Sequence, residues 1–199
     1  MVAPNLGLAS QIIIKNRKGY LMLKKLLIVI ATIIAIPLIV AIFVQDSYEV
    51  EREVIINQPN MVVFNYVKLL KNQDNFSKWA QMDPEMTKSY RGTDGEVGFV
   101  SAWDSQNPDV GTGEQEIIAI KDGERIDFEL RFLKPFEASE PAFMSTESIS
   151  ENQTKIIWGF SGHMDYPMNI MFLFMDFEQI IGDDLQTGLN NLKVILEEQ

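Results

Sequence analysis

The stretch GEQEIIAIKDGERIDFELRF, residues 113–132, contains the strongest hairpin signal in the chain. Apolar and polar residues alternate on both sides of Asp122-Gly123, and a period of two is typical of a strand with one buried face. An Asp-Gly pair readily adopts the backbone conformations of a tight turn between antiparallel strands. The stretch therefore predicts two paired strands, 113–121 and 125–132, the second of which presents one apolar face: Ile126, Phe128, Leu130 and Phe132.

Further short segments of the same kind lie on either side of this hairpin. Turn residues separate them: Thr93-Asp94-Gly95, Asn107-Pro108-Asp109 and Glu151-Asn152. The predicted strands are 86–91, 97–103, 143–150 and 155–163. The last strand also has an apolar face: Ile156, Trp158, Phe160 and Met164. With the hairpin, these segments predict an antiparallel meander.

Helical patterns flank the meander. The alternating segment 48–56 predicts a first strand, and Pro59 behind it suits the first turn of a helix. Further helical turns are expected over 72–79, before Asp83-Pro84 stops them. After Pro167 a period of 3.6 predicts a long helix with one apolar stripe: Phe174, Phe177, Ile181, Leu185, Leu189, Leu192 and Leu196. Gly182 and Gly188 weaken this helix, so we expect either a bend or a close approach of backbone and ligand there.

This order of one strand, two short helices, six strands and a long helix resembles the helix-grip fold of the START-like (SRPBCC) superfamily. The chain resembles the polyketide cyclase/dehydrase-like branch of this superfamily in five features. They are the segments REVIINQP (52–59), VVFNYV (62–67) and IIWGFSG (156–162), Trp79, and the amphipathic last helix. The resemblance covers roughly residues 48–198 and implies an α+β domain. A curved antiparallel sheet of about seven strands would wrap the C-terminal helix, with two short helices after strand 1 and a cavity for a hydrophobic ligand. It implies no catalytic residue, since the branch has no shared catalytic motif.

A long apolar run precedes this domain. In residues 26–44 only Thr32 and Pro37 are not apolar, and a 19-residue helix is roughly 29 Å long, close to the hydrocarbon thickness of a bilayer. The leader, residues 1–25, is basic and the residues after the run are acidic, which predicts a single-pass membrane protein with a cytoplasmic N-terminus and an extracytoplasmic domain. A cleaved signal peptide and a secreted form are the alternative, although the run is longer than usual and ends in a poor cleavage site. We expect residues 1–20 to be weakly structured. Met22 is also a plausible first residue of a membrane-anchored protein.

Composition limits the function classes. Residues 45–199 carry 12 basic and 28 acidic residues, a net charge of −16. Such a domain would repel a phosphate backbone, so we expect no nucleic acid partner and a ligand that is neutral, apolar or cationic. The absence of cysteine excludes disulfides and thiolate chemistry, and a single histidine excludes a His-rich metal site. We therefore expect neither a metal nor a cofactor.

Inward-facing aromatic and aliphatic side chains form the candidate site. They would line a hydrophobic pocket between the sheet and the last helix, or they would simply fill the core. The predicted ligand-binding residues are Trp103, Phe128, Leu130, Trp158, Phe160, Phe177 and Ile181.

Other chemistry-bearing residues have simpler interpretations. The strand parity of His163 places it away from the apolar face, which favours a surface histidine over a proton shuttle. A set of carboxylates falls mostly on the polar parity of its strands, which favours a solvated outer face over acid/base work: Glu114, Glu116, Asp127, Glu129 and Glu147. A cluster of methionines is expected to plug an irregular core rather than to adapt to ligands: Met164, Met168, Met171 and Met175.

Three functions are compatible with these patterns. The first is a membrane-anchored domain that binds a small hydrophobic molecule, a lipid or a polyketide-like compound, without catalysis. The second is a cyclase or dehydratase, which requires buried polar groups with shifted pKa values inside the pocket. The third is an acidic protein-interaction module with a filled core.

Overall fold

A computed structural model describes residues 6–198 of the chain, with side chains from Tyr20 onward. These residues form two compact units. One contains the N-terminal helix and the segment Asp165–Phe174, and the other contains Asp46–Met164 together with the chain from Met175. The first five residues of the expected leader, and residue 199, lie outside the described part of the chain.

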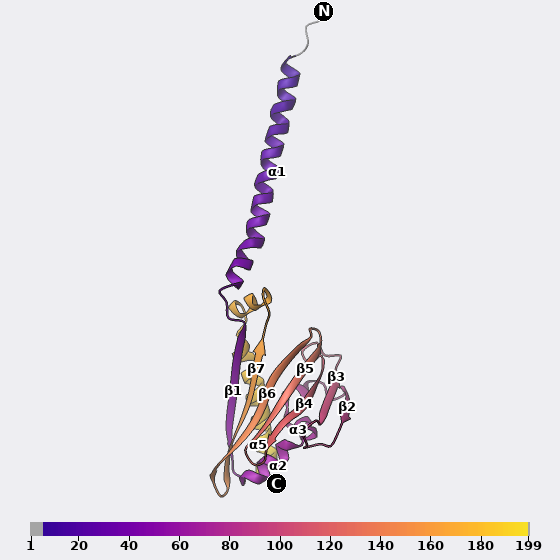
Figure 1. The fold of residues 1–199 in the computed structure, drawn as a ribbon, viewed down its shortest axis with the longest axis vertical. Helices are drawn as coiled ribbons and strands as arrows, with labels where there is room; N and C mark the ends of the chain where they lie inside the picture. The colour runs from indigo at the N-terminus through magenta and orange to yellow at the C-terminus, as the bar shows by residue number, and fades with distance from the viewer. Residues whose placement is uncertain (1–5, 199) are drawn as a thin grey trace, which may run out of the picture. The chain divides into compact units, whose positions relative to one another are not determined.

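The larger unit is built on one seven-stranded sheet in which all neighbouring strands are antiparallel. The strands are β1 (Ser47–Ile56), β2 (Thr87–Arg91), β3 (Val100–Asp104), β4 (Thr112–Lys121), β5 (Arg125–Lys134), β6 (Ala138–Ser150) and β7 (Gln153–His163). Their order is β1-β7-β6-β5-β4-β3-β2, so β2 to β7 form the predicted meander and β1 pairs with the last strand (Figure 1). The predicted meander is therefore confirmed.

The hairpin around Asp122-Gly123 lies where the sequence predicts it, with the same loop between the two strands. Lys121 pairs with Arg125, which leaves a three-residue loop, and Glu124 N donates to Lys121 O at 2.9 Å. Gly123 takes a φ of 75°, the left-handed region that favours glycine in such loops.

Short helices connect β1 to β2, which lie at opposite edges of the sheet. They are α2 (Asn60–Lys68), the 3₁₀ turn η1 (Leu70–Asn72), α3 (Gln73–Phe76) and α4 (Lys78–Met82). Helix α2 begins directly after Pro59, as its sequence predicts. Val63, Phe64 and Val67 on α2 and Phe76 on α3 are fully buried in the core. The connection therefore covers part of the inner face of the sheet.

The long helix α5 (Phe177–Glu197) packs on the same core. Its predicted stripe is buried from Leu185 to Leu196, whereas Phe174 lies before the helix and is 76% exposed. The Asp176 carboxylate accepts a hydrogen bond from Gln179 N at 2.9 Å and so caps the N-terminus. The α+β class and the helix-grip arrangement of a sheet, short helices after the first strand and a long C-terminal helix are confirmed.

Side chains of the sheet occupy the space beside the two helix glycines. A Cβ atom on Gly182 would lie 2.0 Å from Arg52 Nη2, and one on Gly188 would lie 2.7 Å from Trp158 Cζ3. We had expected a bend or a close approach of a ligand at these glycines, and the structure instead places side chains of β1 and β7 beside them.

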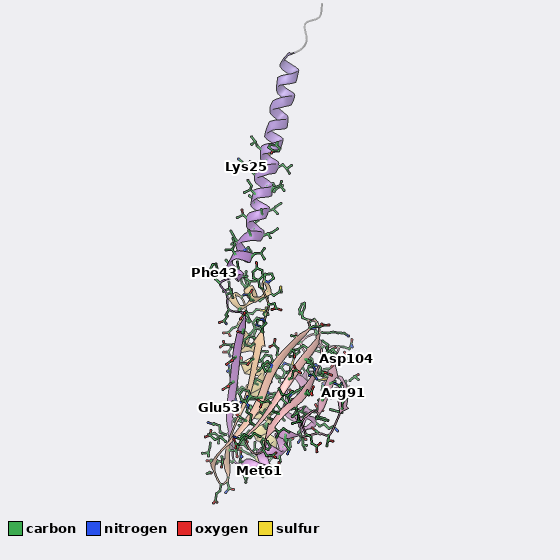
Figure 2. The ribbon with its side chains drawn as sticks, in the orientation of Figure 1. Lys25, Phe43, Glu53, Met61, Arg91 and Asp104 are labelled. Carbon is green, nitrogen blue, oxygen red and sulfur yellow. The ribbon has the colours of Figure 1, made fainter. Side chains whose placement is uncertain are left out.

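The smaller unit consists of helix α1 (Leu6–Ala41) and the segment 165–174, which includes the 3₁₀ helix η2 (Met168–Leu173). Helix begins at Leu6, so the expectation of a weakly structured leader is wrong for residues 6–20. Side chains from Tyr20 to Val40 are all exposed and point outward around the helix (Figure 2). Within the described residues, Tyr20–Ala41 is long and apolar enough to cross a membrane, a property that signal sequences share.

The methionine cluster does not plug the core as expected. Met168 and Met175 are 55% and 39% exposed, and Met164 and Met171 are half-buried. The structure also groups residues 165–174 with α1, whereas the sequence pattern had placed them inside the domain 48–198.

Candidate ligand-binding site

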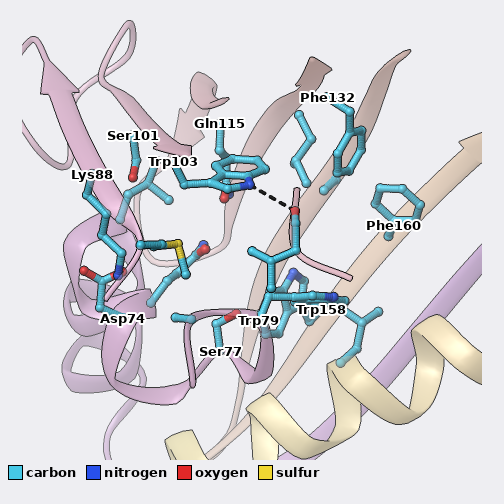
Figure 3. A pocket seen from close by; sticks show the side chains of 18 of the residues that line it. Asp74, Ser77, Trp79, Lys88, Ser101, Trp103, Gln115, Phe132, Trp158 and Phe160 are labelled. Carbon is cyan, nitrogen blue, oxygen red and sulfur yellow. Dashed lines mark hydrogen bonds and ion pairs between the residues drawn. The ribbon is translucent and has the colours of Figure 1, made fainter. Parts of the chain in front are cut away.

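A cavity of about 290 Å³, partly open to solvent, lies inside the larger unit. Side chains from β2 to β7, from the helical connection between β1 and β2, and from α5 line it (Figure 3). The volume is near the lower end of the roughly 300–1,000 Å³ that is usual for ligand pockets. Space for a small guest therefore remains between the sheet and the helices.

All three tryptophans of the chain line this cavity: Trp79, Trp103 and Trp158. Trp158 on β7 is only 6% exposed, and its ring meets those of Phe76 and Trp79 edge-on, with centroids 5.8 and 6.1 Å away. Such perpendicular contacts are the favoured arrangement of aromatic rings and hold Trp158 in place. The absence of a side chain at Gly188 leaves room for this ring beside α5.

Trp103 on β3 is fixed in a comparable way. Its ring lies against Gly113 of β4, where a Cβ atom would be 2.6 Å from Trp103 Cζ2, and it meets Phe132 edge-on at 6.3 Å. The indole Nε1 donates a hydrogen bond to Val110 O at 3.3 Å, which ties the β3–β4 loop to the cavity wall (Figure 3). Contacts with β4, with the Phe132 ring and with the β3–β4 loop thus hold Trp103 in place in the cavity wall.

A few polar groups interrupt the apolar wall. Asp74 and Lys88 pair with each other at 2.7 Å. Gln115 on β4 is 9% exposed and also lines the cavity. Gln73 Nε2 is buried without a partner among the described residues. An unpaired buried amide group is costly, so Gln73 is suited to bind a polar group of a guest.

The structure brings five of the seven residues that we had predicted to the cavity: Trp103, Leu130, Trp158, Phe160 and Ile181. Phe128 shares its strand face with Leu130 but is fully buried in the core. Phe177 instead stacks on Tyr48, with ring centroids 5.9 Å apart. Neither of these two residues lines the cavity.

Sequence reasoning omitted other lining residues, among them Trp79, Gln115 and Phe132. Phe132 shares parity with Leu130, so its strand pattern contained the necessary signal. Gln115 has the parity opposite to Glu114 and Glu116, so its strand pattern also indicated the inner face. Trp79 had no such signal, because its position depends on how the helical connection folds over the sheet.

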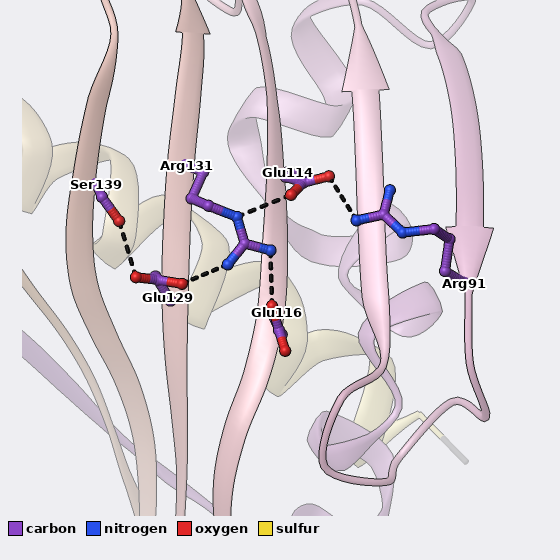
Figure 4. A network of polar contacts seen from close by, with 6 residues as sticks. All are labelled: Arg91, Glu114, Glu116, Glu129, Arg131 and Ser139. Carbon is purple, nitrogen blue, oxygen red and sulfur yellow. Dashed lines mark hydrogen bonds and ion pairs between the residues drawn. The ribbon is translucent and has the colours of Figure 1, made fainter.

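The candidate acid/base carboxylates point to the opposite face of the sheet, because successive side chains of a strand alternate between faces. Arg131 on β5 binds Glu114 and Glu116 of β4 at 2.8 and 2.7 Å, and it also pairs with Glu129 (Figure 4). Hydrogen bonds from Arg91 and then from Arg131 lower the pKa of Glu114. These groups form a charged outer network, as their polar parity predicts.

One buried carboxyl group lies away from the cavity. Glu140 on β6 is 8% exposed and accepts a hydrogen bond from His163 N at 3.1 Å. Burial raises the pKa of Glu140, and burial together with the Glu140 charge raises the pKa of Tyr48 to about 12. His163 itself is exposed at the end of β7, as predicted. Neither Glu140 nor His163 lines the cavity.

Several solved structures share this fold at low sequence identity. Ara h 8.0201 matches 77% of this chain and 99% of its own chain, with a TM-score of 0.54 and 14% identity. The Aha1 dimer from Colwellia psychrerythraea matches 75% and 96%, with a TM-score of 0.52 and 11% identity. A protein from Thermobifida fusca matches 75% and 93%, with a TM-score of 0.51 and 16% identity. No protein-family model and no curated protein matches the chain. At these identities the likeness concerns the fold, which is the helix-grip fold.

Proposed function

We propose that this protein binds a small hydrophobic molecule in the cavity of its helix-grip domain, and that α1 anchors the domain to a membrane. The observation that carries the proposal is the cavity of about 290 Å³ with its aromatic wall. Burial of apolar ligand surface against such a wall is the main favourable term in binding. The resemblance to the START-like polyketide cyclase/dehydrase-like branch supports a lipid or polyketide-like guest.

The polar groups narrow the chemistry of the ligand. Gln73 and Gln115 present amide groups that accept and donate hydrogen bonds. The guest is therefore an apolar compound of modest size with at least one carbonyl or hydroxyl group. Binding rather than catalysis is proposed, because the buried carboxyl group with a raised pKa, Glu140, lies outside the cavity.

The anchoring part of the proposal rests on α1. The exposed apolar helix Tyr20–Ala41 matches the length of a bilayer span, and the basic residues before it favour a cytoplasmic N-terminus. The acidic domain would then work on the extracytoplasmic side.

A pair of matched variants tests the binding function. Ala142 on β6 lines the cavity and is 6% exposed, whereas Ala119 on β4 is exposed and lies outside the lining. The full-length wild type, Ala142→Phe and Ala119→Phe are purified in the same detergent, and bound small molecules are extracted and identified by mass spectrometry. Lipids that adhere to α1 are common to all three proteins and cancel in the comparison.

We expect one class of apolar compound in wild type and in Ala119→Phe, and its loss from Ala142→Phe. Circular dichroism of both variants checks that the domain is folded. A wild type without any such compound, or equal amounts in both variants, would contradict the proposal.

A further inference from the structure

The C-terminal end of α1 is closed by a side chain from a distant part of the sequence. Asn169 in η2 is 3% exposed, and its Nδ2 donates hydrogen bonds to Ala41 O at 2.8 Å and to Val44 O at 3.0 Å. The last carbonyls of a helix have no partner within the helix. In hydrocarbon such groups cannot turn to water, so a partner from elsewhere in the protein is required.

The segment that carries Asn169 is apolar and uncharged. Residues 167–175, PMNIMFLFM, contain Asn169 as their one residue with a polar side chain, and acidic residues flank them at Asp165 and Asp176. Yet several apolar side chains of this segment are not buried in the protein. Met168, Leu173 and Phe174 are 55%, 57% and 76% exposed.

The end of α1 adds to this apolar surface. Phe43 and Ile42 are 83% and 65% exposed, and both follow the last helical residue, Ala41. Phe43 N bonds to Val40 O at 2.9 Å, so the chain makes a tight turn at this point. The Asn169 bonds hold 165–174 against that turn, within one compact unit.

We infer that the segment 165–174 is a second membrane contact, which inserts Met168, Leu173 and Phe174 into the interfacial layer of the bilayer where α1 leaves it. This inference rests on the proposed anchoring by α1. The occupant of the apolar surface is lipid, because the surface continues from the exposed apolar helix and residues 167–175 carry no charge. An uncharged, apolar segment beside a membrane span lowers its free energy when its side chains leave water for the acyl boundary.

The contact has a consequence for the domain. The chain enters the sheet at β1 directly after α1 and enters α5 directly after the segment. The chain would therefore contact the membrane twice, once before β1 and once before α5, whereas a single span would give it one attachment.

The absence of cysteine makes a site-specific test direct. Single cysteines are introduced into the full chain by Phe174→Cys, Ile34→Cys and Glu151→Cys, and each is labelled with a nitrobenzoxadiazole fluorophore in phosphatidylcholine vesicles. Ile34 lies within α1 and reports on anchoring, and Glu151 is an exposed turn residue that serves as the water control. Spin-labelled lipids, carrying the quencher either near the headgroup or deep in the acyl chain, report on contact with the bilayer.

We expect blue-shifted emission at positions 34 and 174, with position 174 quenched most by the shallow spin label and position 34 most by the deep one. The label at position 151 should remain red-shifted and unquenched. Quenching at position 34 with none at position 174 overturns the second contact and leaves the anchor intact. Blue-shifted emission at position 174 that no lipid quenches also overturns it, in favour of a second copy covering the surface. A red-shifted, unquenched label at position 34 overturns the proposed anchor and the second contact together.

Discussion

Replacing either glycine of α5 by alanine should have opposite consequences for stability, because the two neighbouring side chains differ in their freedom to move. Alanine is favoured over glycine inside a helix by about 1 kcal/mol, so both substitutions start from the same gain. At Gly188 the new Cβ would lie 2.7 Å from Trp158 Cζ3 and 3.5 Å from the Phe76 carbonyl oxygen. At Gly182 it would meet the guanidinium of Arg52.

The Trp158 ring has little room to yield. It is 6% exposed and is held edge-on by Phe76 and Trp79. Overpacking of this kind costs about 1–3 kcal/mol, which cancels or exceeds the gain from helix propensity. We therefore expect Gly188→Ala to destabilise the domain by roughly 0–2 kcal/mol.

Arg52 can move at lower cost. Its guanidinium is the far end of a flexible side chain, and its movement disturbs two solvent-exposed hydrogen bonds, from Nη2 to Glu178 O at 3.4 Å and from Nη1 to Glu51 O at 2.8 Å. Because water can replace both partners, we expect a cost of about 1 kcal/mol or less, so Gly182→Ala should be neutral or stabilising by up to about 1 kcal/mol. The difference between the two variants is then centred near about 1.5 kcal/mol, within a range of about 0–3 kcal/mol.

Urea unfolding of the full chain in detergent, followed by tryptophan emission, measures this difference. All three tryptophans line the cavity, so the emission reports on the domain and not on α1. Gly188→Ala should also change the native emission spectrum, because Trp158 must shift, whereas Gly182→Ala should not. Equal midpoints, or a Gly188→Ala variant more stable than Gly182→Ala, would refute the view that Trp158 is wedged against the helix.

Three further predictions concern the outer network, a buried carboxyl group and the cavity wall. Arg131→Gln should destabilise the domain by about 1 kcal/mol at neutral pH, since its ion pairs are partly solvated. The pKa of Glu114 is lowered in the fold, so this cost should shrink as pH falls through that pKa, which thermal melts of both proteins at neutral and acidic pH would reveal. Burial raises the pKa of Glu140, so the fold should lose stability as pH rises through the ordinary range of carboxyl pKa values. Glu140→Gln should therefore raise the melting temperature at neutral pH and lose that advantage in acid. An equal shift in melting temperature at neutral and acidic pH would contradict burial of a charged carboxylate as the cause. Phe128→Ala should lower the free energy of unfolding by about 3–5 kcal/mol, because that ring is fully buried. Phe160→Ala should lower it less and should reduce the amount of co-purified ligand. The reverse order of urea midpoints would contradict the position of Phe160 at the cavity.

Much of the fold could be predicted because its signals are local. Alternation around Asp122-Gly123 placed β4 and β5, and the turn needed only a glycine at a positive φ. The stripe Leu185 to Leu196 identified the buried side of α5 from spacing alone. These features depend on the period of strands and helices and on turn chemistry, which each short segment encodes by itself.

The candidate site could be predicted only in part. Phe128 and Leu130 have the same strand parity, and yet one is sealed in the core and the other lines the cavity. The parity of a strand residue tells which face of the sheet its side chain points to, but not which elements pack on that face. Helices α2 to α5 pack there, and they are distant in sequence from β5. Trp79 reaches the cavity for the same reason, because the helical connection that contains it has no periodic link to the strands that it covers.

The methionines before α5 show the same division. Composition alone determined that residues 167–175 are apolar and uncharged, and we expected the methionines here to plug an irregular core. The tertiary structure joined Asn169 to the end of α1 and left Met168 and Phe174 exposed. The sequence by itself thus determined the elements, their inward faces, the charge of the domain and an apolar helix long enough to cross a bilayer. Only the tertiary structure decided where space remains between those faces and which apolar side chains stay uncovered, because both depend on packing between segments far apart in the chain.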